Sequence, residues 1–266
     1  MSAIEWTGVT WNPTTGCDRI SPGCDHCYAL AMARRLKAMG AAKYQTDGDP
    51  RTSGPGFGLA MHEAALSIPL RVRAPRLWFV NSMSDLGHAS VTAPFLARVW
   101  GVMAATQRHT YQTLTKRPPR LRTLLNSPAF RDLVQAEVDG DLPWPLPNVW
   151  VGTSIELDDY ARRASHLRAT PAAVRFLSIE PLLGPLPSLD LAGIDWVILG
   201  GESGPGARPV ELGWFRDIIG QARDTGTAVF VKQLGAVLAA DGGKGGDMDR
   251  WPADLRIREY PATVAA

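Results

Sequence analysis

Short apolar runs recur along the chain, and each one ends in polar or charged residues. They occupy residues 76–85, 110–118, 148–156, 175–181, 195–204 and 228–235. Continuous apolar sequence of this kind is typical of parallel strands that are buried on both faces. Together with the segment from Val9 to Trp11, these runs predict seven strands.

Amphipathic helical patterns separate the runs. They occupy residues 30–40, 93–107, 119–127, 129–137, 158–170 and 213–226. Strands that alternate with helices predict βα units and a parallel sheet, and therefore an α/β fold. Residues 41–58 are rich in Gly, Pro and Asp and predict a long loop, which is either a lid or substrate-binding segment or a disordered stretch.

The composition is that of one large core. The chain has 266 residues, of which 45% are hydrophobic. No apolar run reaches the roughly 18 residues of a membrane span, and the first residues lack the pattern of a signal peptide. Since the three cysteine thiols of the chain must stay reduced, we expect a cytoplasmic protein without a membrane partner. The net charge of +2 does not by itself indicate nucleic acid.

All the cysteines lie within eleven residues, with the spacing C-x6-C-x2-C at Cys17, Cys24 and Cys27. A disulfide framework would need an even number spread along the chain, whereas clustered soft thiolates favour zinc, copper(I) or an iron–sulfur cluster. Structural zinc and simple iron–sulfur sites use four protein ligands, so three thiolates leave one position open. Two alternatives are three buried structural cysteines and a zinc site completed by His26 or His88.

Ionisable groups follow six consecutive predicted strands. They are Asp85, Lys116 with Arg117, Glu156 after Ser154, Glu180, Glu202, and Lys232 with Gln233. In βα barrels the carboxyl ends of the strands meet on one face, where the chemistry collects. The pattern therefore predicts a shared polar site, the alternative being that each charge is a solvated loop residue.

A series of motifs in a fixed order carries a resemblance to a known family. The motifs are TWNPTTGC, SPGCDHCYA, NSMSD, LTKRP, EPLLGP, GGESGPGARP and VKQLG. From Trp6 to about Gly235 the chain resembles an uncharacterised phage and actinobacterial family that is grouped with the radical S-adenosylmethionine (SAM) superfamily. Its cysteine spacing departs from the superfamily's commonest C-x3-C-x2-C. The resemblance implies a partial (βα)6-7 TIM-like barrel over residues 1–240, with a cysteine loop at 12–28 and an extension at 241–266 that packs on or near the barrel.

The resemblance also implies an activity. Cys17, Cys24 and Cys27 would hold a 4Fe-4S cluster, whose open iron binds SAM. Reductive cleavage of SAM would give a 5′-deoxyadenosyl radical that abstracts hydrogen from a substrate, with electrons from a donor such as flavodoxin or ferredoxin. The residues implied to bind the cofactor are Ser84, Asp85, Ser154, Glu156, Gly200, Gly201 and Glu202.

Three further residues are candidates for substrate contact or proton transfer, namely Lys116, Glu180 and Lys232. A nucleic acid or nucleotide is the favoured substrate, because the basic segments 71–76 and 116–122 would suit phosphates, although exposed arginines would explain them equally well. The competing functions are a non-catalytic, zinc-dependent nucleic-acid-binding protein and a barrel hydrolase whose carboxylates bind a metal.

Overall fold

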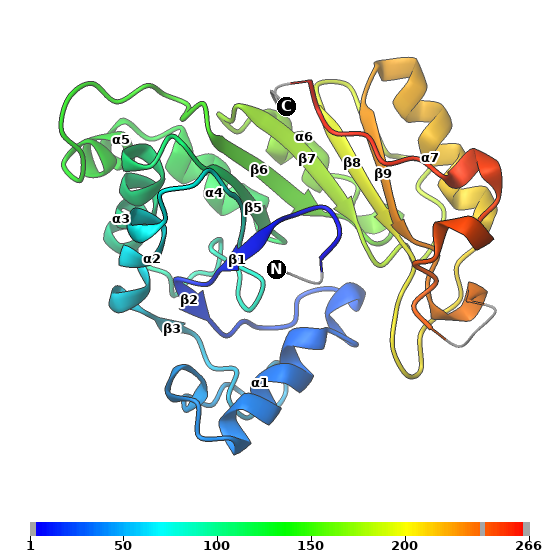
Figure 1. Ribbon diagram of the computed structural model, residues 1–266, viewed down its shortest axis with the longest axis horizontal. Coiled ribbons are helices and arrows are strands. Elements are labelled where there is room, and N and C mark those ends of the chain that lie inside the picture. Colours follow the sequence, from blue (N-terminus) through cyan, green and yellow to red (C-terminus); the bar gives the residue numbers. More distant parts are fainter. Residues whose placement is uncertain (1–3, 240–242, 263–266) are drawn as a thin grey trace. The chain divides into compact units, whose positions relative to one another are not determined.

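A computed structural model describes residues 4–239 and 243–262 (Figure 1). The chain divides into two compact units, and each is described by itself. The first unit comprises Met1–Val151 and Ala169–Ala173, and the second comprises Gly152–Arg168 and Val174–Ala266. Strand β6 (Val149–Ser154) contributes residues to both.

The main sheet has seven strands in the order β1-β4-β5-β6-β7-β8-β9. Besides β6 they are β1 (Val9–Trp11), β4 (Leu77–Val80), β5 (Thr110–Thr115), β7 (Val174–Ile179), β8 (Trp196–Gly200) and β9 (Ala228–Gln233). The helices are α1 (Tyr28–Ala38), α2 (Ser67–Arg71), α3 (Ala93–Ala105), α4 (Pro118–Leu125), α5 (Pro128–Gln135), α6 (Arg163–Arg168) and α7 (Leu212–Thr225). The predicted α/β class and each of the seven predicted strands are confirmed.

In the first unit, β1, β4 and β5 pair in parallel, with Trp11 opposite Val80 and Trp78 opposite Tyr111. These four side chains are buried, because both faces of the strands are covered. Helices α2 and α5 pack against α3, and α4 packs against α5 (Figure 1). Thr92 begins α3 by accepting a hydrogen bond from the amide of Phe95, as expected of a threonine N-cap.

In the second unit, β7, β8 and β9 also pair in parallel. Trp196 is completely buried between Phe176 and Phe230. Arg258 forms an antiparallel bridge with Phe230, so the described part of the C-terminal extension runs beside β9 (Figure 1). Residues 241, 242 and 263–266 of that extension lie outside the described residues.

Short elements account for most differences from the predicted pattern. Residues 158–170 form a 3-10 turn at Asp158–Tyr160 and then α6, not one continuous helix. Helix α2 and a small antiparallel sheet of β2 (Thr14–Thr15) and β3 (Ala60–Met61) were not predicted. Two to five residues are too few to show a periodicity, so tertiary contacts decide these elements.

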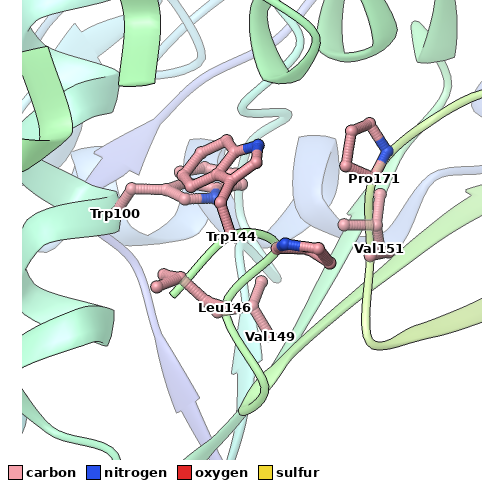
Figure 2. A pocket seen from close by; sticks show the side chains of 8 residues that line it. Trp100, Trp144, Leu146, Val149, Val151 and Pro171 are labelled. Atoms are coloured by element: carbon pink, nitrogen blue, oxygen red, sulfur yellow. The ribbon is translucent and has the colours of Figure 1, made fainter. Parts of the chain in front are cut away.

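A small cavity lies in the first unit between α3, β6 and the segment before β6. Figure 2 shows Trp100 and Trp144 on one side of it and Val151 and Pro171 on the other. Its volume is about 10 Å³, which is no more than the space of one water molecule. The predominantly apolar lining identifies it as a gap in packing and not as a substrate site.

Candidate functional site

The cysteine loop is fixed on one side by the segment that follows β4. Asn12 accepts a hydrogen bond from the amide of Met83 through Oδ1 (3.0 Å), and the amide of Gly16 donates to the carbonyl of Met83 (2.9 Å). The hydroxyl of Ser84 donates to the carbonyl of Gly16 (2.6 Å) and accepts from Thr14 (2.9 Å). Two motifs that lie far apart in the sequence, TWNPTTGC and NSMSD, therefore fold against each other.

Residues 46–58 fix the loop on its other side. The amide of Cys17 donates to the carbonyl of Phe57 (3.2 Å), and Thr52 donates to Asp18 Oδ1 (2.6 Å). Gly16 has φ +86°, and a Cβ there would lie 2.1 Å from the carbonyl oxygen of Gly58. The segment 41–58, predicted to be either a lid or substrate-binding segment or disordered, is thus a folded loop that contacts the cysteine loop. Its first residues form a 3-10 turn at Ala42–Tyr44.

The three thiols have different surroundings. Cys24 is buried, whereas Cys17 and Cys27 are partly buried and pack against an apolar cluster that includes Phe57 and Met83. Burial raises the pKa of Cys17 to about 12, and the charge of Asp85 adds to this effect. Burial also raises the pKa of Cys27. Cys17 and Cys27 are therefore protonated at neutral pH, and a metal that binds them must release their protons.

Cationic groups after β5 oppose this rise. Arg117 donates through its NH1 nitrogen to Cys17 Sγ (3.3 Å), and this hydrogen bond and the charge of Arg117 lower the pKa of Cys17. The same nitrogen donates to Asp85 Oδ2 (2.9 Å), which anchors the guanidinium. The charge of Lys116 lowers the pKa of Cys27. Arg117 and Lys116 were both predicted to lie at the end of β5, but nothing in the sequence showed that Arg117 would contact a cysteine.

The two histidines considered as zinc ligands differ in their surroundings. His88 Nδ1 accepts from the amide of Ser90 (3.2 Å), so Nε2 carries the proton and donates to Asp18 Oδ2 (2.8 Å). Hydrogen bonds from Thr52 and His88 lower the pKa of Asp18. His26, the other histidine considered as a zinc ligand, is exposed.

Three thiols on one loop are the donor set of a thiolate-bound metal or cluster. Cys24 lies close enough to both other cysteines for their charges to interact, and cations flank Cys17 and Cys27. Within 4–239 and 243–262, however, no group of three or more Cys, His, Asp or Glu side chains has the arrangement of a metal site. The residues fit a thiolate-bound group in kind and in the charges around them.

The second unit pairs each predicted carboxylate with a cation. Glu156 Oε2 accepts from Arg163 (3.0 Å), and both side chains are buried. Arg208 donates to Glu202 Oε2 through Nε (2.9 Å) and to Oε1, which closes the exposed loop between them. Arg163 and Arg208 lie only seven and six residues from their partners, a spacing that could have suggested both pairs.

The third pair joins the ends of β7 and β9. Lys232 Nζ donates to Glu180 Oε1 (2.5 Å), and 15% and 19% of the two side chains is exposed. A Cβ on Gly200 would lie 3.2 Å from Glu180 Cγ, so the absence of a side chain there makes room for the pair. At Gly201 the close approach is made by the carbonyl of Leu234, 2.3 Å from a Cβ position. Ser154 is buried, and its carbonyl accepts from Arg163 (2.9 Å).

The two basic segments differ in their exposure. Arg117 contacts the cysteine loop, and Arg120 donates to the carbonyls of Leu86, His88 and Val91, so segment 116–122 directs two arginines inward. The arginines of segment 71–76, by contrast, are all exposed. The segment precedes β4, at the opposite end of that strand from the cysteine loop.

Comparison with known proteins places the chain in a family. A family model described as "Protein of unknown function (DUF5131)" matches residues 1–256, and the chain therefore belongs to this family. No curated protein and no solved structure matches the chain. Among the described residues, no helix has the length and apolar character that crossing a membrane requires.

Proposed function

We propose that this protein is a radical SAM enzyme whose sheet forms a partial barrel of the radical SAM type. In this proposal Cys17, Cys24 and Cys27 hold a 4Fe-4S cluster. When bound, the cluster supplies an electron for the reductive cleavage of SAM, which yields the radical that abstracts hydrogen from the substrate. The protein supplies position, charge and exclusion of water.

The observation that carries the proposal is the fixing of the cysteine loop by three separate segments of the first unit. The segments are 81–85, 46–58 and the residues after β5. Hydrogen bonds of this density at a loop of partly buried thiols favour a ligand-binding role over three incidental structural cysteines. An arginine that donates to one sulfur adds the positive charge that a set of three thiolates needs.

The proposal also assigns residues of the second unit to the substrate or SAM. Glu180 and Lys232 form a partly buried ion pair, so we propose them for substrate contact or proton transfer. Lys116 remains the third candidate. Glu202 and the Gly200–Gly201 backbone are proposed cofactor contacts, whereas Glu156 is completely buried and is paired with Arg163.

We further propose a nucleic acid or nucleotide as substrate, a flavodoxin or ferredoxin as electron donor, and the cytoplasm as location. Exposure of the arginines in segment 71–76 supports contact with phosphates, because one guanidinium group can donate hydrogen bonds to two oxygens of a phosphate. This segment lies away from the cysteine loop, so it would anchor a long substrate and not present the reacting atom.

The test is anaerobic reconstitution with iron and sulfide, followed by absorbance and electron paramagnetic resonance spectra with and without SAM. A reduced cluster signal that changes on addition of SAM is expected. A colourless protein that binds zinc tightly and ignores SAM would contradict the proposal and identify the zinc-dependent nucleic-acid-binding alternative. Tight zinc binding to the cysteines and DNA binding lost on zinc removal would define that alternative.

A further inference from the structure

Asp85 has no acceptor capacity left for a cofactor. Its Oδ1 accepts from the amide of Gly87 (2.8 Å) and from the hydroxyl of Thr115 (2.6 Å). Its Oδ2 accepts from the amide of Lys116 (3.0 Å) and from Arg117 (2.9 Å). A carboxylate offers about four acceptor sites, and all four are used. The side chain is also buried, with only 8% exposed.

These contacts instead hold Arg117. Asp85 fixes the guanidinium of Arg117 through NH1, and the backbone amide of Arg117 donates to the hydroxyl of Thr115 (2.8 Å). Because a guanidinium is planar and rigid, fixing one edge directs the remaining N–H groups. They reach Cys17 Sγ (3.3 Å) and the carbonyl of Asp18 (3.0 Å), so one side chain grips two adjacent residues of the cysteine loop.

We propose that Asp85 and Arg117 act as one positioning unit for the sulfur of Cys17, and that Asp85 is not a contact for the methionine part of SAM. The inference rests on the proposed function, since it assigns a role at the proposed cluster ligand. Hydrogen bonds and charge around a ligating sulfur orient it and tune the reduction potential of the bound group. Arg117 supplies both, and Asp85 decides where Arg117 points.

The variants are Asp85→Asn, Arg117→Gln and Arg117→Lys. The control is Arg122→Gln, which removes a charge from α4, the helix that follows Arg117, outside this network. Iron and sulfide per chain, iron retention against a chelator, and the midpoint potential are measured after reconstitution. SAM affinity is measured by equilibrium dialysis.

Asp85→Asn and Arg117→Gln should each lose about 10- to 100-fold in iron affinity, the usual effect of removing a partner of a metal ligand. Arg117→Lys should restore part of it, and Arg122→Gln should match the parent.

The midpoint potential separates positioning from simple charge. Loss of Arg117 removes a positive charge beside a thiolate and should make the potential more negative, because the reduced form carries more negative charge. If Asp85 acts by directing Arg117, Asp85→Asn should shift the potential in the same direction. A shift to more positive values, as removal of an anion alone would give, contradicts the proposal. So does an Asp85→Asn variant with full iron and weakened SAM binding.

A further measurement needs no cluster. In the metal-free protein, the two substitutions and their combination form a double-mutant cycle for unfolding in urea. A positioning unit predicts that the combined effect is smaller than the sum of the single effects, and additive effects overturn it. If the parent assembles no cluster, the proposed function fails, while the cycle still decides whether Asp85 and Arg117 act together.

Discussion

Both units have charged residues at the ends of their strands, but these residues have different partners in the two units. In the first unit, Asp85 and Arg117 converge on the loop that carries the thiols. In the second unit, Glu156 and Glu202 each bind an arginine close to them in sequence. A charged residue at the end of a strand therefore indicates a functional site only when the residues that it binds also contact other reactive side chains, such as the thiols here.

Burial sharpens the same contrast. Glu156 is completely buried with Arg163, and such a pair contributes chiefly by avoiding an uncompensated charge. The Glu180–Lys232 pair is partly exposed and lies over Gly200, so it alone among these three pairs joins the ends of two non-adjacent strands. It is the pair of the second unit most suited to meet a ligand.

The largest expected difference between the regions concerns iron. Replacement of Cys17, Cys24 or Cys27 by Ala should abolish cluster assembly, because each removes one of three thiolate ligands in the proposed site. Glu202→Gln, in the second unit, should retain the iron of the parent. Iron and sulfide analysis after anaerobic reconstitution measures both. Any single cysteine variant with a full complement of iron would show that the loop is not the site.

The second effect concerns the stability of the buried pair in the second unit. Arg163→Met should leave the carboxylate of Glu156 buried without its cation and should lower the free energy of unfolding by about 3–5 kcal/mol. Its control is Arg216→Met, which breaks the exposed Arg216–Asp254 pair of the same unit and should have a much smaller effect. Urea unfolding followed by tryptophan fluorescence compares the two, and equal losses would contradict a burial effect.

Two glycines of the first unit offer a matched test of how tightly the cysteine loop is enclosed. Gly16 and Gly40 both have positive φ, so alanine at either position should cost about 1–2 kcal/mol in backbone strain. A Cβ at Gly40 meets nothing within 4 Å, whereas at Gly16 it would collide with the carbonyl of Gly58. Gly16→Ala should therefore be the more destabilising in urea unfolding and should speed proteolysis within residues 46–58. Similar values for both variants would mean that the segment yields easily.

The sequence predicted the strands and the core because both depend on local apolar pattern. Each predicted strand is present, and Trp78, Trp150 and Trp196 within these strands are buried. The cysteine loop was also found from spacing alone. The enclosure of that loop was not, since Gly16 meets Gly58 and Arg117 meets Cys17 over separations that no local pattern records. Ser84 and Asp85 were predicted as cofactor contacts, whereas the hydrogen bonds that they make in the structure are to other residues of the first unit.

The smallest effect concerns pH and again separates the units, since the described residues with a pKa raised to about 12, Cys17 and Tyr111, both lie in the first. Burial favours the neutral phenol of Tyr111, whose hydroxyl lies 2.6 Å from that of Thr106. The folded state holds this proton more tightly than the unfolded chain, in which the pKa is about 10. The resulting stability is complete below about pH 10 and is lost as pH rises toward 12. Tyr111→Phe should lose about 1 kcal/mol at neutral pH with its hydrogen bond, yet should decline less between pH 10 and 12. Because Cys17 is common to both proteins, the difference between their unfolding curves isolates Tyr111, and parallel curves would show that the phenol ionises without cost.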